Sequence, residues 1–148
     1  MIAYVFWHHV GAAVDHAAHE AALRELHERL RATPSEGFLE SATFRVRGLP
    51  WIAEGSEAYE DWYLLRDSAA LDPLNESAVA GDRRAPHDAA ARLASAGAGG
   101  LYRLRAGNPS FEARSVTWFG KPSGMTYAAL DALLAPSLAG DAALWRRQ

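Results

Sequence analysis

Two adjacent histidines, His8 and His9, are the residues of this chain whose chemistry best suits proton transfer. Imidazole is the side chain that gains and loses a proton near neutral pH. The pair ends an apolar, alternating segment over residues 2–9 that predicts a β-strand covered on both sides. Neighbouring side chains of a strand point to opposite faces, so only one of these histidines can line a given cavity. Arg66, at the end of another predicted strand, completes the candidate catalytic set as a polar anchor.

A second interpretation of the histidine pair is structural. A strand-end pair can consist of one solvated imidazole and one hydrogen-bonded imidazole, and no catalytic partner is evident from the sequence. If there is a site, we expect His8 and His9 to matter more than the other four histidines, because side chains at the end of a central strand are held rigidly.

Aromatic side chains form the candidate ligand-binding set, and the chain holds five tryptophans and five tyrosines. Trp7, Trp51, Trp62 and Tyr63 are the candidates, because such rings can wall an apolar pocket for a flat organic molecule. Trp51 lies in a connection bounded by glycine and proline and is the candidate for a lid or for a residue that reaches across to a partner subunit. The alternative is that these rings form the core and a dimer interface, where tryptophan and tyrosine are enriched.

A helix predicted over residues 16–32 carries His16, His19 and Glu20 on one side. Histidine with a carboxylate suits zinc or iron, but the spacing is neither His-Glu-x-x-His nor a facial triad. His16 and His19 continue an apolar stripe whose other members are Leu23, Leu26 and Leu30. We therefore predict packing positions there and no metal ligands. His27 lies off that stripe among charged residues and is predicted to be solvated.

Other catalytic motifs are missing from the sequence. Cysteine is absent, which excludes thiol catalysis, disulfides and thiolate metal sites. The segment 120–124, Gly-Lys-Pro-Ser-Gly, lacks the order of a phosphate loop, and no serine occupies a Gly-x-Ser-x-Gly elbow. The sequence names no cofactor, and none is expected.

Composition narrows the class of protein. The 148 residues are 49% hydrophobic and 22% charged, which is typical of one globular domain. A net charge of −3 argues against a nucleic-acid partner. The first apolar run ends at His8, far short of a membrane span, and no basic leader precedes it. We expect a cytoplasmic protein with no membrane partner.

The predicted elements give a β-α-β-β-α-β order. Strands are predicted over 2–9, 38–47, 59–66 and 101–105, with helices over 16–32, from 69 and over 85–96, and a turn over 97–100. This is the ferredoxin-like arrangement of an α+β fold, a four-stranded antiparallel sheet with two helices on one face. Residues 1–106 would form that core of a single domain spanning 1–148. Residues 107–148 would extend it with a strand at 114–119 and a helix at 126–134.

The element order, with the aromatic segment from Tyr59 to Leu71, resembles the dimeric α/β-barrel superfamily, and in particular its uncharacterised bacterial members. The resemblance implies a homodimer in which two sheets pack face to face. It also implies a wide range of activities, since the superfamily includes monooxygenases, decarboxylases, isomerases, haem enzymes and proteins without known activity. No catalytic residue is carried over from it.

The sequence is consistent with two functions. One is a small-molecule-binding protein or enzyme with an aromatic-lined pocket for an apolar or aromatic molecule. The other is a non-catalytic homodimeric interaction or regulatory module without a ligand site. A cavity with convergent polar groups would favour the first, and a space filled by side chains would favour the second.

Overall fold

The computed structural model describes residues 1–11, 13–49, 51, 57–138, 140 and 142–148. Most of the connection predicted over 48–56 lies outside these residues. The chain forms two compact units, Met1–Tyr102 and Arg103–Gln148. The division falls four residues before the boundary that the sequence suggested, and the organisation as one domain stays a prediction.

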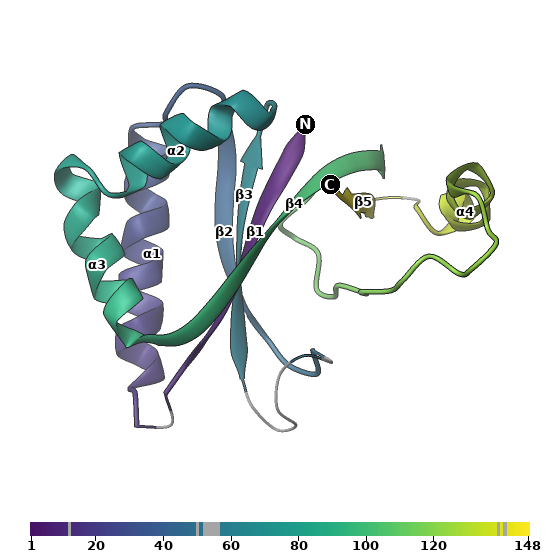
Figure 1. Ribbon diagram of the computed structural model, residues 1–148. Helices are drawn as coiled ribbons and strands as arrows, with labels where there is room; N and C mark the ends of the chain where they lie inside the picture. The colour runs from purple at the N-terminus through teal and green to yellow at the C-terminus, as the bar shows by residue number, and fades with distance from the viewer. Residues whose placement is uncertain (12, 50, 52–56, 139, 141) are drawn as a thin grey trace. The chain divides into compact units, whose positions relative to one another are not determined.

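The first unit has the predicted element order. Its elements are β1 (Ile2–Val10), α1 (His16–Ala32), β2 (Phe38–Val46), β3 (Ala58–Leu65), α2 (Leu71–Ala78), α3 (Arg84–Leu93) and the first part of β4 (Ala94–Gly107). Strand order is β2-β3-β1-β4-β5, and β3 pairs antiparallel with both β1 and β2. Helices α1, α2 and α3 all lie on one face of these strands (Figure 1). The predicted ferredoxin-like α+β fold is confirmed.

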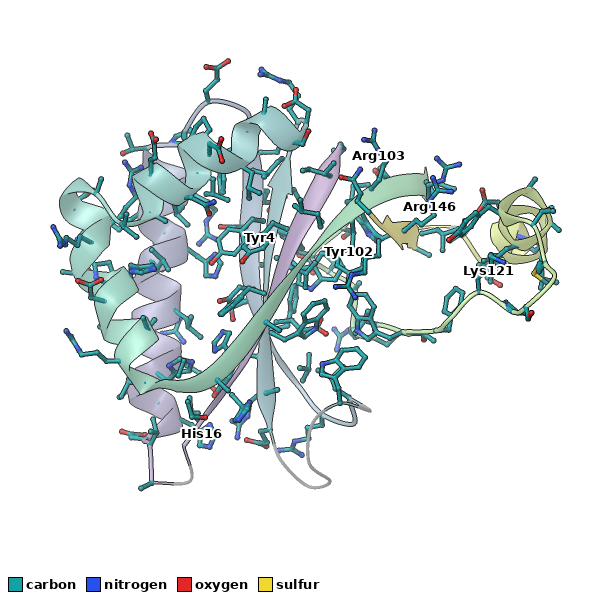
Figure 2. All side chains as sticks on the ribbon, viewed as in Figure 1. Tyr4, His16, Tyr102, Arg103, Lys121 and Arg146 are labelled. Atoms are coloured by element: carbon teal, nitrogen blue, oxygen red, sulfur yellow. The ribbon has the colours of Figure 1, made fainter. Side chains whose placement is uncertain are left out.

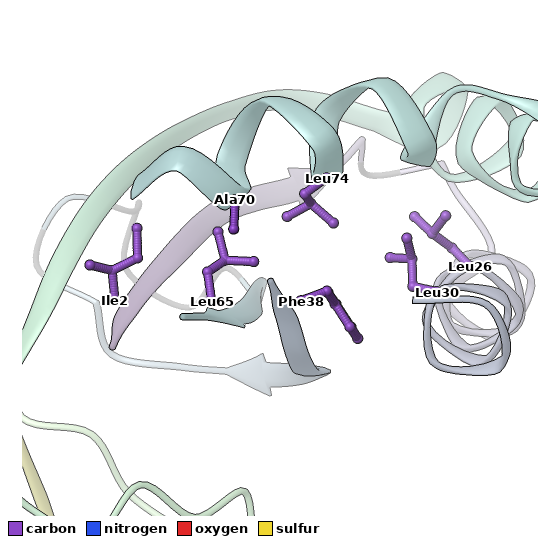
Figure 3. Packing of buried hydrophobic residues seen from close by; sticks show 7 residues of the cluster. All are labelled: Ile2, Leu26, Leu30, Phe38, Leu65, Ala70 and Leu74. Carbon is purple, nitrogen blue, oxygen red and sulfur yellow. The ribbon is translucent and has the colours of Figure 1, made fainter. Parts of the chain in front are cut away.

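Helix α1 is placed by its cap and its apolar stripe. The Asp15 carboxylate accepts a hydrogen bond from the Ala17 amide at 2.9 Å, as an N-cap residue does. The helix ends at the residue before Thr33-Pro34, where proline disfavours helical geometry. Leu26 and Leu30 pack into the main core cluster (Figure 3). The other members come from the three strands and from the segment at the start of α2: Ile2, Phe38, Leu65, Ala70 and Leu74.

Strand register decides which side chains face the helices. Ile2, Phe38 and Leu65 pack against α1, and side chains two residues apart share a face. The helix side of the sheet therefore carries Ile2, Tyr4, Phe6 and His8 of β1; Tyr59, Asp61, Tyr63 and Leu65 of β3; and Phe38, Ser41, Thr43 and Arg45 of β2. Figure 2 shows Tyr4 on this side of β1. The opposite side is called the helix-free side below.

A bulge in β2 brings Ser41 to the helix side. The register shifts between Phe38 and Glu40, so that Phe38 pairs with Leu65 and Ser41 pairs with Tyr63. The extra residue reverses the alternation of the strand, as β-bulges do. Leu39 is left 49% exposed. Without this shift Ser41 would face away from α1.

The turn predicted over 97–100 is wrong, because these residues belong to β4. The glycines are needed there for space. A Cβ atom at Gly97 would collide with the Phe6 ring, and one at Gly99 would lie 2.6 Å from the Tyr4 hydroxyl oxygen. The aromatic rings of β1 thus lie across β4, and glycine marks the close approach rather than a chain reversal.

The second unit contains the end of β4, α4 (Tyr127–Leu134) and β5 (Ala143–Arg147). The helix predicted at 126–134 is present, and Thr126 caps it, since its hydroxyl accepts from the Ala129 amide at 3.1 Å. The Arg146 guanidinium lies 4.5 Å from the centre of the Tyr127 ring. Both Arg146 and the neighbouring Lys121 are labelled in Figure 2.

A strand over 114–119 is wrong, since these residues have no regular structure. The added strand is β5, which takes the edge of β4. The Asn108 amide donates to the Ala142 carbonyl at 3.1 Å, and Gly107, with φ +81°, allows the close approach. Alternation alone predicts a strand wherever it occurs, but only a segment that reaches an open edge becomes one.

We expect Gly97→Ala to destabilise the protein by about 1–3 kcal/mol, because the new methyl group overpacks the contact between Phe6 and β4. Gly11→Ala is the matched control, since its methyl group would meet nothing nearer than a Val14 methyl at 3.8 Å. Urea denaturation measures both variants. Equal stability of the two would show that the Phe6 ring does not fix the approach of β4.

Candidate functional site

A buried hydrogen bond joins β1 to β3 on the helix side. Nε2 of His8 lies 3.0 Å from Oδ2 of Asp61, and the side chains are 2% and 5% exposed. Helix α1 adds His27, whose Nε2 lies 3.5 Å from Oδ1 of the same carboxylate. Nδ1 of His27 in turn lies 2.8 Å from the hydroxyl oxygen of Ser41 on β2. These four residues, called the His–Asp cluster below, come from four elements, namely β1, β3, α1 and β2.

Asp61 carries its negative charge inside the protein. Burial alone would raise the pKa of this carboxyl, but the hydrogen-bonding imidazoles of His27 and His8 outweigh that effect and hold the pKa below its usual range. An ionised carboxylate only accepts hydrogen bonds. Each neighbouring imidazole therefore turns an Nε2–H toward Asp61.

The charge of Asp61 determines which kind of ring nitrogen can face it, because only an N–H group can donate to a carboxylate. With Nε2–H donated to Asp61, the lone pair of His8 is on Nδ1, which is buried and has no hydrogen-bond partner among the described residues. The lone pair of His27 is likewise on Nδ1, where the Ser41 hydroxyl donates to it. Nδ1 of His27 thus has Ser41 as its hydrogen-bond partner, whereas Nδ1 of His8 has none among the described residues.

His19 lies beside the cluster on α1 and is fully buried. Its ring centre is 5.2 Å from that of His8 and 4.9 Å from that of Tyr59. Neither ring nitrogen finds a hydrogen-bond partner in the part of the chain that the structure describes. Burial, and then the proximity of His8, lower the pKa of His19 to about 4, so the ring is neutral at pH 7.

Tyr59 links the buried cluster to the surface end of α1. Its ring stacks on His8 at 5.5 Å and 17°, because the two residues are directly paired across the strands. Its hydroxyl donates to Glu20 at 3.0 Å and accepts from Nδ1 of His16 at 2.9 Å. Burial and Glu20 raise the pKa of Tyr59 to about 12. His16, labelled in Figure 2, is half-buried at this end of the helix.

The structure separates the three candidate catalytic residues. His8 lies in the His–Asp cluster, whereas His9 points to the helix-free side and is half-buried. The Arg66 side chain is 58% exposed and pairs with Asp67 at 3.1 Å and Glu36 at 3.4 Å. Arg66 is therefore a surface residue. A catalytic role for any of the three stays a prediction.

Three of the four candidate ligand-binding aromatics gather on the helix-free side. The indole N–H groups of Trp7 and Trp62 donate to the buried carboxylate of Glu60, at 2.8 and 3.1 Å. The edge of Trp51 meets Trp7 with ring centres 5.7 Å apart. Tyr63 lies on the other side, where it stacks on His27 at 5.3 Å. The predicted set is thus divided by the sheet, and its ligand-binding role stays a prediction.

The sequence analysis missed Asp61, His27 and Ser41. The expectation that His27 is solvated is wrong, since the residue is 2% exposed. Residue 27 is four positions after Leu23, so it widens the stripe on α1, and a helix packed on a sheet buries a wider face than one seam. The two adjacent acidic residues, Glu60 and Asp61, within an aromatic-rich strand were the available signal. Ser41 could not be found, because the bulge that turns it inward leaves no mark in the sequence.

Ser41, His27 and Asp61 are the residue types of a hydrolytic triad, but their placement does not suit nucleophilic attack. Ser41 is 1% exposed, and Arg31 of α1 holds its backbone carbonyl at 2.8 Å. A nucleophile must reach the carbonyl group of its substrate. The arrangement suits holding and moving protons rather than attacking carbon.

Within the described ranges, no group of three or more histidine, aspartate or glutamate side chains is placed to hold a metal ion. The same residues include no helix that is long and apolar enough to cross a membrane.

No family model matches the chain, and no curated protein matches its sequence. Solved structures do share its fold. SnoaB, described as a cofactor-independent oxygenase from Streptomyces nogalater, is 20% identical over 74% of this chain and 97% of its own, with a TM-score of 0.51. A protein from Arabidopsis thaliana is 8% identical over 72% of this chain and 97% of its own, with a TM-score of 0.53.

A third similar structure is a dimeric ferredoxin-like protein of unknown function from Thermobifida fusca. It is 14% identical over 68% of this chain and 87% of its own, with a TM-score of 0.47. SnoaB and the Arabidopsis protein thus share the fold of this chain.

The buried His19 makes stability depend on pH. Its pKa is about 4 in the folded protein and about 6.5 in the unfolded chain, so the unfolded state binds more protons between these values. His19 therefore leaves the free energy of unfolding unchanged above pH 6.5 and lowers it as the pH drops toward 4. We expect wild type to lose about 2 kcal/mol more than His19→Leu between pH 7 and pH 4.5, measured by urea denaturation. Parallel losses in the two proteins would contradict a depressed pKa.

Proposed function

We propose that this chain is an enzyme that removes a proton from a small apolar or aromatic molecule, with His8 as the general base and Asp61 as its orienting partner. The observation that carries the proposal is the buried His8–Asp61 pair, which leaves the basic Nδ1 of His8 inside the protein without a described partner. A histidine held by a buried carboxylate is a common arrangement for a catalytic base.

The cost of this cluster supports a functional role. A buried polar atom without a hydrogen bond destabilises a fold by about 1–3 kcal/mol. Nδ1 of His8 and both nitrogens of His19 are such atoms, and they lie on neighbouring rings. Apolar side chains would fill the same space at less cost. The unused hydrogen-bonding capacity is what a bound molecule with a polar group would satisfy.

The chemistry follows from the protonation states. His8 would take a proton on Nδ1, and the imidazolium so formed would be stabilised by the Asp61 carboxylate at 3.0 Å. The neutral His19 would donate an N–H to the anion left on the substrate, as preorganised donors do at developing charge. The rings of Tyr59 and Phe6, which flank His8, would contact the apolar body of the molecule.

The likeness to SnoaB supports an enzyme rather than a non-catalytic module. That protein is described as a cofactor-independent oxygenase. The His–Asp cluster would supply acid–base chemistry to this chain by side chains alone.

We also propose that the chain forms a homodimer through the helix-free side. Ala42, Phe44, Val46 and Trp62 stay half-buried there on adjacent strands, and β2 is the edge of the sheet. A second copy would cover these residues. Light scattering at micromolar concentration should give twice the chain mass, and a single species near 16.1 kDa would contradict the dimer.

The location of the site predicts different effects for the two adjacent histidines. A thermal-shift screen of aromatic metabolites, flavins, haem and divalent metals identifies a ligand, and isothermal titration calorimetry then measures its affinity. We expect His8→Gln to weaken binding at least tenfold, because Nδ1 of His8 lies on the helix side. His9→Gln, whose side chain lies on the other face, should bind as wild type does.

Measurement of kcat distinguishes a defect in the chemical step from a defect in ligand binding. With a ligand that is converted, Asp61→Asn should lower kcat by about 10²–10⁴, because the general base His8 then loses the carboxylate that orients it and stabilises its imidazolium. His87→Gln, at a half-buried position on α3, is the control. Loss of binding in His9→Gln with unchanged binding in His8→Gln would place the site on the helix-free side and overturn the proposal.

A further inference from the structure

We infer that Ser41 and His27 are positioning residues that fix the protonation state of the His8–Asp61 pair from the opposite side of the carboxylate. The inference deepens the proposed function and rests on it for its catalytic meaning. Ser41 and His27 touch neither Nδ1 of His8 nor any group that a substrate would reach first. They act through Asp61.

The first step is the geometry at Ser41. Two side chains of α1, one helical turn apart, hold this residue: Nδ1 of His27 at the hydroxyl and Arg31 at the backbone carbonyl, both at 2.8 Å. The bulge in β2 is what presents Ser41 to them. Because the contact between the hydroxyl and His27 is short and buried, the hydroxyl is held against the His27 ring.

The second step is the tautomer of His27. A hydroxyl that donates to Nδ1 stabilises the tautomer with hydrogen on Nε2. That Nε2–H faces Oδ1 of Asp61 at 3.5 Å, while His8 donates to Oδ2 at 3.0 Å. Each carboxylate oxygen thus has its own imidazole, and Tyr63 stacks on His27 and restrains its ring.

The third step is the effect on His8. The titratable groups that face Asp61 are His8 and Tyr4 on β1, His19 and His27 on α1, and Tyr63 on β3. Of these, His27 and His8 are the hydrogen-bonding groups that keep the carboxyl ionised. If His27 turned its lone pair toward Oδ1, the carboxylate would lose a donor and bind a proton more readily. A protonated Asp61 could no longer stabilise the imidazolium of His8.

Histidine nitrogen NMR on the full-length protein tests the inference without a ligand. Long-range ¹H–¹⁵N spectra report which nitrogen of each imidazole carries hydrogen. In wild type we expect hydrogen on Nε2 of both His8 and His27. In Ser41→Ala the Nδ1–H form of His27 should increase several-fold, and the pKa of Asp61, followed by carboxyl ¹³C shifts, should rise by about one to two units.

Two variants separate this role from simple packing. Ser41→Thr keeps the hydroxyl and should restore the wild-type tautomer. Thr43→Val is the matched control, because it removes a buried hydroxyl from the same face of β2 that has no hydrogen-bond partner among the described residues. If Ser41→Ala is too unstable for NMR, His27→Gln gives the same carboxyl readout, since it also disturbs the donor to Oδ1.

The outcomes are distinct. An unchanged His27 tautomer in Ser41→Ala, or an equal change in Thr43→Val, overturns the positioning role alone and leaves His8 as a candidate base. In His27→Gln, an unchanged Asp61 carboxyl titration overturns it as well. Unchanged ligand affinity in His8→Gln overturns the proposed function instead, whatever the tautomers are.

Discussion

A single carboxylate held between two imidazoles is the constraint around which the first unit is arranged. Asp61 is ionised although it is buried, and it stays so only while His8 and His27 donate to it. One donor comes from β1 and the other from α1. The helix must therefore lie over the strands in one position, and any sliding of α1 would leave a charge unpaired in the interior, which costs several kcal/mol. Leucine packing alone would tolerate more displacement.

The sheet separates two buried acidic groups that are adjacent in the sequence. Glu60 and Asp61 are consecutive in a strand, so their side chains face opposite sides of the sheet. The hydrogen-bond donors differ between the two sides. Glu60 accepts from two indoles on the helix-free side, whereas Asp61 on the helix side accepts from His8 and lies 3.5 Å from Nε2 of His27. Indole N–H cannot exchange a proton near neutral pH, whereas imidazole can. The two sides of the sheet therefore differ in the chemistry of their buried donors, with indoles on one side and imidazoles on the other.

Much of the fold was predictable because local signals and the hydrophobic pattern agree. Asp15 and Thr126 cap the expected helices, and β1 alternates as a central strand should. Predictions failed where a tertiary contact decides the outcome. The glycines of β4 predict a turn, but they lie in a strand, where any larger residue would collide with the rings of Tyr4 and Phe6. Residues 114–119 alternate like a strand, yet β5 occupies the edge.

The site was less predictable than the fold for a related reason. His8 was identified from its residue type and its strand, which are local properties. Its partners come from positions 27, 41 and 61, and only the register of three strands and the phase of α1 bring them together. The bulge in β2 is the least visible of these determinants, since one extra residue reverses which side chains face inward. A serine that would otherwise be an ordinary solvent-facing residue thus becomes the group that selects the tautomer of His27, and through Asp61 it reaches the base on the far side of the cluster.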